Sequence, residues 1–409
     1  MDHGGEIIEA VSSMIWPGEA VVHVSIVNWV KGKAKGKKRL YIQEGNDVST
    51  GWRHQEFDTI GPSLSFDVEV STAKSITVNS AKGGCFQGQT HGHKYFLMKA
   101  NDAKLQLLKN PEYQDVLFPF LIADDLIGEI NSKPTRYVID FGSKNVLEAK
   151  RYSGLYERVE SYVLPDRKAA AEKEAKKNQE AAEANPKAKA ARDHEMALNT
   201  WWQLFRPRAE MLRSITALPR YIVCGRVTKR PIFEFVSPAI HPNDALQVFA
   251  FADDYSFGIL QSDFHWTWFT GRCSTLKSDF RYTSNTVYDS FPWPQKPDIN
   301  QIKKVAAAAK HLRELRTVLR IKHRMSLREL YRSLELPGSN PLRDAHQSLD
   351  KAVASAYGID ADADKSTFLL DLNARVIGLQ EAGEAITAPG LPPIVKDATP
   401  FISDDCLLP

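Results

Sequence analysis

The sequence predicts an α+β fold, with strands through most of the first 250 residues and helices after Pro297. After Pro297, apolar residues recur at the spacing of an amphipathic helix. Within the first part, residues 166–195 are alanine-rich, and eight Lys/Arg alternate with seven Asp/Glu, which is typical of a solvated helix or strut. Runs rich in β-branched residues predict strands at 20–30, 39–43, 136–140, 220–230, 232–236 and 246–251.

Length and composition set the class of protein. A chain of 409 residues with 43% hydrophobic content has room for two or three domains, each with a core. The net charge is only +3, so a nucleic-acid surface requires local segregation of charge. No apolar run approaches the roughly 20 residues of a membrane span. The four cysteines form no Cys-x-x-Cys pair, which disfavours zinc ribbons and disulfide frameworks and fits a cytoplasmic location.

The first sixty residues predict a short helix at 6–14 and then a β-hairpin of strands 20–30 and 39–43. Six of the nine residues 31–39 in the connecting turn are basic and none is acidic. This turn is either a solvated edge that discourages aggregation or a phosphate contact. Because an isolated hairpin is marginally stable, it must belong to a larger sheet.

Residues 83–94 are rich in glycine and contain His91 and His93. A phosphate-cradling loop requires a following helix, whereas a strand is predicted here. A metal site lacks further ligands at a suitable spacing. We therefore favour a structured turn that packs one domain on another. Strands are predicted around it at 65–70, 75–78 and 95–98.

The tetrapeptide Asn110-Pro111-Glu112-Tyr113 is similar to the Asn-Pro-Pro-aromatic catalytic loop of amino-methylating DNA methyltransferases, which holds a target base. Its third position is Glu112, however, and the preceding residues follow a good helix cap at 101–102. We interpret the tetrapeptide as a turn that ends a helix.

Two basic segments carry the candidate binding residues. The hairpin 220–236 places cations near its tip, beside Glu234, which suits a cytosine amine. Residues 276–294 combine cations, hydroxyls and an amide before the closing sequence Phe-Pro-Trp-Pro, which suits phosphates and base edges. The alternatives are an ordinary solvated hairpin and a surface loop. The candidate DNA-contacting residues are Arg226, Lys229, Arg230, Glu234, Lys277, Arg281, Tyr282, Ser284, Asn285 and Tyr288.

The C-terminal part predicts helices. Residues 256–269 form an apolar helix in which His265 packs in the core. Residues 303–332 hold ten Lys/Arg against two acidic residues, a clustering that favours a polyanion partner over a merely solvated face. Further helices are expected at 349–358 and 368–378, and the proline-spotted tail from 389 is expected to be loose.

Taken in order, these segments resemble the C-terminal half of MmeI-like enzymes, which are single-chain type IIG/IIL restriction-modification proteins. That family joins a nuclease, a helical connector, an adenine-N6 methyltransferase, a target-recognition domain and a C-terminal helical domain. The resemblance implies four regions here. They are the edge of a class I methyltransferase domain (1–60), a target-recognition domain (61–297) with a charged helical insertion at about 166–195, a helical domain (298–388) and a loose tail (389–409). The matching segments are 20–30, 39–43, 85–94, 219–230, 276–294 and 349–358.

The resemblance implies sequence-specific recognition of double-stranded DNA within an S-adenosylmethionine-dependent adenine-N6 methyltransferase. The family's glycine-containing cofactor loop, its Asn-Pro-Pro-aromatic loop and its Asp…Glu-x-Lys nuclease pattern are missing from the chain. We therefore predict no catalytic, cofactor-binding or metal-ligating residue and leave enzymatic activity open. A truncated gene, a late start and one half of a split enzyme with a separate catalytic chain remain alternatives. So do an active methyltransferase with an unorthodox site and an RNA-binding or structural scaffold.

Overall fold

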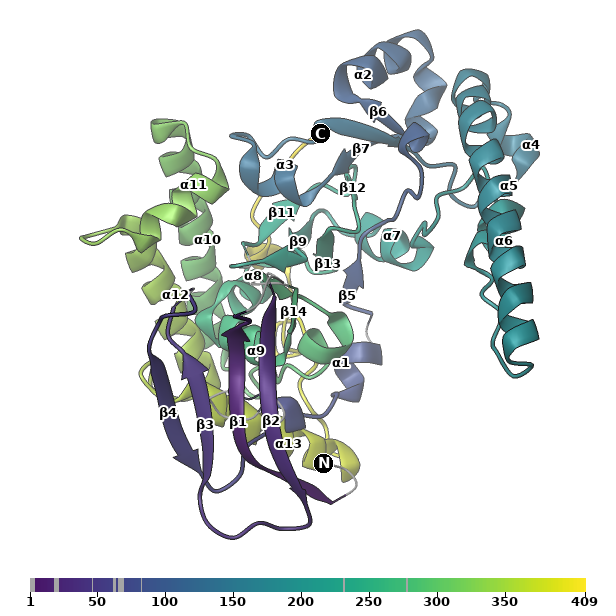
Figure 1. Cartoon of the computed structure of the whole chain (residues 1–409). Coiled ribbons are helices and arrows are strands. Elements are labelled where there is room, and N and C mark those ends of the chain that lie inside the picture. The colour runs from purple at the N-terminus through teal and green to yellow at the C-terminus, as the bar shows by residue number, and fades with distance from the viewer. Residues whose placement is uncertain are drawn as a thin grey trace.

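A computed structural model describes residues 4–17, 22–45, 47–61, 64, 70–81, 83–230, 232–276 and 279–409. An N-terminal sheet lies beside the C-terminal helices, and a long helical hairpin projects from the opposite side of a central β-rich region (Figure 1). None of the helices in these ranges is long and apolar enough to cross a membrane.

The N-terminal sheet has the strand order β2-β1-β3-β4. Strand β1 pairs antiparallel with β2 and parallel with β3, so β2 and β3 do not form the expected hairpin. The predicted helix at 6–14 is also wrong, because these residues form β1. Their apolar side chains recur at helical spacing because two register shifts, at 7–9 and 11–14, interrupt the alternation of the strand. The strands are β1 (Gly5–Ile15), β2 (His23–Lys31), β3 (Lys38–Gln43) and β4 (Trp52–Phe57).

The basic turn before β3 is partly neutralised within the fold. Lys38 is buried, and its Nζ lies 3.2 Å from the carboxylate of Glu6. The Nζ of Lys37 lies 2.7 Å from Asp58. At these two positions the turn stabilises its own sheet.

Strands β6, β7 and β8 of the region from 70 to 141 form a second sheet with β12 (His241–Pro242), in the order β12-β7-β8-β6. The strand expected at 136–140 is confirmed, whereas the strand expected at 75–78 is wrong because α1 occupies it. Most of the strand expected at 65–70 lies outside the described residues. The elements are η1 (Val70–Thr72), α1 (Thr77–Ala81), β5 (Cys85–Gln87), η2 (Lys94–Phe96), β6 (Leu97–Lys99), α2 (Ala100–Lys109), η3 (Pro111–Asp115), β7 (Leu117–Leu121), α3 (Ala123–Gly128) and β8 (Arg136–Ile139).

The predicted helix-ending turn at Asn110 is confirmed. Asn110 is the C-cap of α2, and its N–H donates to the carbonyl of Gln106. Tyr113 is buried in the core beside the second sheet, and its hydroxyl oxygen accepts from the N–H of Gly154 at 3.2 Å. The tetrapeptide is structural.

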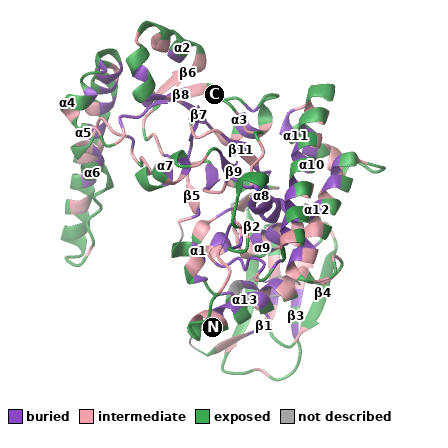
Figure 2. Cartoon of the chain, turned by 180° about the vertical axis from the view of Figure 1, so that it is seen from behind, coloured by how far each residue is buried: buried purple, intermediate pink, exposed green. Residues whose placement is uncertain are grey.

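The charged segment is helical and solvated, as predicted, and most of α5 is exposed (Figure 2). That it folds back as a helical hairpin was not predicted. Helix α5 ends at Ala184. Asn185 is its C-cap, and Pro186, which follows, disfavours helical backbone at Asn185. Helix α6 packs back on α5, because the carboxylate of Glu174 accepts from the N–H groups of His194 and Glu195. The helices here are α4 (Val146–Ala149), α5 (Ser153–Ala184), α6 (Asp193–Asn199) and α7 (Ala209–Thr216).

The central sheet has the order β11-β9-β13-β5, and the hairpin of β9 and β11 is as predicted. Strand β9 is buried on both faces. Ile222 and Cys224 pack toward α8, α9 and α10, while Tyr221 and Val223 pack toward α3 and α7. The strands are β9 (Tyr221–Gly225), β10 (Val227–Thr228), β11 (Glu234–Val236), β12 (His241–Pro242) and β13 (Leu246–Phe249).

Two helices, α8 and α9, replace the single helix expected at 256–269, because Ser262 has extended backbone between them. Every residue of α8 is buried (Figure 2). His265 packs in the core as predicted and is fully buried. The elements that follow are α8 (Asp254–Gln261), α9 (Asp263–Arg272), β14 (Ser274–Leu276), β15 (Asp279–Arg281) and the π-helix η4 (Ser284–Tyr288).

The C-terminal helices are as predicted in type, and the apolar positions of α10 face the core. Gly358 ends α12 with a left-handed φ of 73°, which a glycine adopts without strain. The elements are α10 (Ile299–His323), α11 (Leu327–Arg332), η5 (Ser333–Glu335), α12 (Pro341–Tyr357), α13 (Lys365–Glu381) and η6 (Thr399–Phe401).

The tail is not loose, contrary to the prediction. Leu407 forms a parallel bridge with Val236 at the edge of the central sheet. The carboxylate of Asp405 lies 3.0 Å from Arg220 and 2.7 Å from Arg313. The tail therefore joins the central sheet to α10, because it supplies the carboxylate that two buried guanidinium groups require.

Candidate nucleic-acid interface

The fold brings the two predicted basic segments together. Strand β10 pairs antiparallel with β15, so that Val227 lies opposite Arg281. The N–H of Tyr282 donates to the carbonyl of Arg226 at 2.8 Å. Arg226 and Arg281, which are distant in the sequence, are thus held at one end of the central region.

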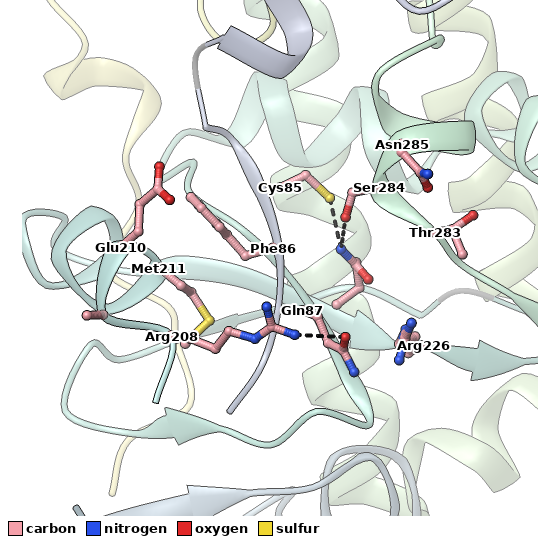
Figure 3. Close-up of a pocket in the computed structure, with 12 residues that line it drawn as sticks. Cys85, Phe86, Gln87, Arg208, Glu210, Met211, Arg226, Thr283, Ser284 and Asn285 are labelled. Carbon is pink, nitrogen blue, oxygen red and sulfur yellow. Dashed lines mark hydrogen bonds between the residues drawn. The ribbon is translucent and has the colours of Figure 1, made fainter. Parts of the chain in front are cut away.

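A pocket of about 520 Å³ opens beside this strand pair, between β5, the start of α7 and the π-helix (Figure 3). Arg226, Ser284 and Asn285 were predicted from the sequence, and they share the pocket with side chains that were not. The pocket is lined by Cys85, Phe86, Gln87, Arg208, Ala209, Glu210, Met211, Arg226, Gln247, Thr283, Ser284 and Asn285.

Two arginines face this pocket without an acidic partner. Nη2 of Arg208 donates to Oε1 of Gln87 at 3.0 Å. Among the residues that the structure describes, neither Arg208 nor Arg226 has a carboxylate within 4.0 Å, and the Nε of each has no hydrogen-bond partner. Burial lowers the pKa of Arg208, as does the charge of Arg206. Burial and the charge of Arg281 likewise lower the pKa of Arg226. An anion in the pocket would relieve both effects.

The opposite wall of the pocket is neutral and hydrogen-bonding. Nε2 of Gln247 donates to Oγ of Ser284 at 2.9 Å and to Sγ of Cys85 at 3.1 Å. Burial raises the pKa of the Cys85 thiol to about 12, so the thiol is protonated and is no nucleophile at neutral pH. Asn285 is exposed at the rim. The wall offers amide and hydroxyl groups, which suit a polar ligand rather than an apolar one.

Two predicted base-contacting residues instead bind the C-terminal helices, and the expectation for them is corrected. Arg230 donates to the carbonyl of Tyr331 at 3.0 Å, and its Nη2 lies 3.4 Å from Glu335. The carboxylate of Glu234 lies 2.9 Å from Arg316. The carboxylate of Glu234 is thus engaged within the fold, and Arg230, whose side chain is 40% exposed, is drawn toward the helical region. Packing against that region was not evident from the hairpin sequence alone.

Tyr282 and Tyr288 also depart from the prediction, since both rings are buried. The hydroxyl of Tyr282 donates to Nε2 of His265 at 2.9 Å, while Nδ1 of His265 donates to the carbonyl of Leu260. The two tyrosines therefore anchor the 276–294 segment and face no ligand. Lys229 is exposed near the strand pair, and Lys277 lies outside the described residues.

The glycine-rich turn at 83–94 packs between regions, as predicted. Gln89 and Thr90 form bridges with Asn243 and Arg206. His93 lies 2.9 Å from Asp166 of α5. Within the described ranges, no group of three or more His, Cys, Asp or Glu side chains is arranged to hold a metal ion.

Residues 213–295 match the family described as "MmeI, target recognition domain". The fold resembles that of the type IIL restriction-modification enzyme MmeI, solved in complex with DNA, with a TM-score of 0.68 and 21% identity over 92% of this chain and 46% of MmeI. The resemblance to MmeI-like enzymes is confirmed. DNA methyltransferase A of Bacillus subtilis (strain 168) is 32% identical over 126 residues, which are 30% of this chain and 13% of that enzyme. The chain thus spans less than half the length of either relative.

The segment that matches the MmeI target recognition domain contains Arg226, Arg281, Ser284 and Asn285. It begins at residue 213 and so does not include the pocket residues at 85–87 and 208–211. Sequence reasoning missed Arg208, Gln87 and Gln247 as pocket residues. The basic run around Arg208 was a usable signal. The two glutamines carried none, because a neutral polar residue in a strand shows no preference for a pocket until the strands are paired.

Proposed function

We propose that this chain recognises a specific sequence of double-stranded DNA as part of an S-adenosylmethionine-dependent adenine-N6 methyltransferase of a restriction-modification system. The observation that carries the proposal is the pairing of β10 with β15, which holds Arg226 and Arg281 at one strand pair within the segment that matches the MmeI target recognition domain, neither with a carboxylate partner among the described residues. Arginine without a carboxylate partner suits phosphate or the guanine edge.

The charge distribution supports this assignment. Arg220, Arg313 and Arg316 are buried in ion pairs and hold the protein together. By contrast, Arg226 and Arg281 have no such partner in the described part of the chain and lie beside the polar Ser284 and Asn285. A net charge of only +3 leaves such a local cluster as the main source of attraction for DNA.

The N-terminal sheet does not fit S-adenosylmethionine by itself. Within the described residues 4–61, every regular element is a strand. A cofactor loop of the expected kind requires glycine followed by a helix N-terminus. We assign the chemistry of methyl transfer to residues outside this sequence and derive no catalytic step from it.

We also propose that a segment or separate chain carrying the catalytic half packs on the N-terminal sheet. Ile26 and Trp52 are each 46% exposed, and they line one pocket on the same face of this sheet. Such exposed apolar groups mark an interaction surface. Co-purification of this chain with a catalytic half, lost on Trp52→Lys, would support the arrangement, whereas independent elution of the two would contradict it.

Selection from a random duplex library with the full chain tests the main proposal. We expect one motif to be enriched, and we expect Arg226→Gln and Arg281→Gln each to weaken binding to it at least about tenfold. Arg192→Gln, at an exposed ion pair on α6, is the matched control and leaves binding unchanged. Equal binding to all duplexes, or a preference for RNA of the same length, would overturn the proposal.

A further inference from the structure

We propose that Arg208 and Arg226 together hold one backbone phosphate of the DNA, so that this pocket positions the duplex while β15 and the rim contact its bases. The inference rests on the proposed function and deepens it, because it assigns a ligand class to a wall that lies outside the matched target recognition segment. Its basis is that both arginines line one concave site, with Gln87 between them (Figure 3).

The first step is charge. Neither arginine has an acidic side chain within ion-pair distance among the described residues, although both are partly buried. Glu210 lines the same pocket, but its exposed carboxylate points away from the two arginines (Figure 3). Asp244 lies near enough to raise the pKa of both arginines and so offsets part of their charge, but among the described residues it forms no ion pair with either. Both guanidinium groups therefore lack the direct contact with an anion that a phosphate in the pocket would supply.

The second step is the backbone around Arg208. Arg208 is the N-cap of α7 and has a left-handed conformation, with φ 54° and ψ 47°. No side chain caps the first turn of α7, and Ala209 and Glu210 of that turn line the pocket. The open N–H groups and the positive end of the helix both favour an anion beside the guanidinium groups.

The third step separates phosphate from base. A bidentate contact with guanine needs two parallel N–H groups on one free edge of the guanidinium. Nη2 of Arg208 is engaged by Gln87, and its Nε is enclosed. Arg208 therefore acts mainly as a fixed cation that donates through Nη1, which suits a phosphate oxygen. Gln87 is a positioning residue, because it holds the guanidinium at the pocket wall.

A salt series on duplex binding tests the inference with the full chain. We expect Arg208→Gln to weaken binding roughly fivefold to tenfold for the selected duplex and for single-base variants of it alike, and to reduce the slope of log K against log salt by about one. Arg208→Lys retains most of the affinity, because a phosphate accepts a point charge. Arg192→Gln remains the control.

Loss of discrimination at a single base pair in Arg208→Gln, with no rescue by lysine, would show that Arg208 contacts a base and would overturn the inference. An unchanged salt slope would also overturn the inference.

A second measurement does not depend on DNA recognition. Inorganic phosphate should raise the melting temperature of the wild-type chain above that in chloride of equal ionic strength, and should raise that of Arg208→Gln less. If the chain selects no DNA motif but shows this phosphate effect, the proposed function fails while the anion site stands. If phosphate raises the melting temperatures of the wild type and Arg208→Gln equally, the proposed anion site is refuted.

Discussion

Oε1 of Glu234 lies 2.9 Å from Nη2 of Arg316, and this ion pair ties the central sheet to helix α10. Arg316 also donates to the carbonyl of Phe233 at 2.9 Å. Burial alone would lower the pKa of Arg316, but the charge of Glu234 raises it above its usual value. Helix α10, which the sequence suggested as a free polycation, therefore uses some of its arginines in ion pairs inside the fold.

Glu234→Gln should lower the free energy of unfolding by about 2–4 kcal/mol, because it leaves the buried charge of Arg316 without its counter-ion. Urea denaturation followed by circular dichroism measures the change. Glu314→Gln is the matched control, since Glu314 is 58% exposed and its carboxylate lies 3.8 Å from Lys310 on the surface of α10. The control should cost at most about 0.5 kcal/mol. Equal costs for the two variants would contradict the structural role of Glu234.

Tyr282→Phe should lower the free energy of unfolding by about 1–3 kcal/mol, because Nε2 of the buried His265 loses its donor. Burial lowers the pKa of His265 to about 3, so the ring is neutral and cannot recover by taking up a proton at neutral pH. Thermal unfolding measures this cost. Tyr162→Phe, at a ring that is 49% exposed, is the control and should have little effect. A loss of DNA affinity without a loss of stability would restore Tyr282 as a contact residue.

Asp350→Asn should make the protein more stable than the wild type at pH 8. Burial, and then the nearby Asp263, raise the pKa of Asp350 to about 7 from 3.8, although Lys365 acts in the opposite sense. Between these pH values the folded state binds more protons than the unfolded state, so wild-type stability falls as pH rises. Asparagine mimics the protonated acid and removes this dependence. We expect a gain of about 1–2 kcal/mol at pH 8 and none at pH 4. Parallel pH profiles for the two proteins would refute the assignment.

Asp405→Asn should weaken the attachment of the tail. Burial opposes ionisation of Asp405, but hydrogen bonds and charge from Arg313, with further help from Arg220, lower its pKa to about 2. The stabilisation is therefore present above pH 4 and is lost as pH falls toward 2. Because the side chain is 45% exposed, solvent screening reduces the expected loss to about 1 kcal/mol at pH 7. Chemical denaturation at pH 7 and at pH 3 measures it. Asp404→Asn, at the exposed neighbouring position, should change neither value.

Several elements were predictable because local patterns agree with the tertiary contacts. The hairpin of β9 and β11, the strand β8 and the helices after Pro297 follow from apolar runs and spacing that the core then uses. The turn at Asn110 followed from the local clash that proline imposes on the preceding helix. The prediction of a helix at 6–14 failed because the register shifts of β1 imitate a helical period, and such shifts exist only in relation to the partner strand.

The candidate site likewise has a part that the sequence predicted and a part that only packing decided. Arg226 and Arg281 were singled out as cations among polar neighbours, and strand pairing brings them together. The sequence did not distinguish them from Arg230, because an arginine that pairs with Glu335 and one that remains unpaired look alike along the chain. Ion pairing depends on which carboxylate lies within a few ångströms, and that follows only from packing.

By itself, the sequence determined the α+β class, the charged solvated helix, the basic character of two segments and the resemblance to MmeI-like enzymes, because these depend on residue types and short-range periodicity. Only the tertiary structure decided the order of the N-terminal strands, the anchoring of the tail and which arginines remain available. It also brought Gln87 and Arg208 to the pocket beside Arg226. The physical reason is that burial and charge neutralisation are properties of neighbours in space, and residues far apart in the chain become neighbours only when the sheet and helices pack.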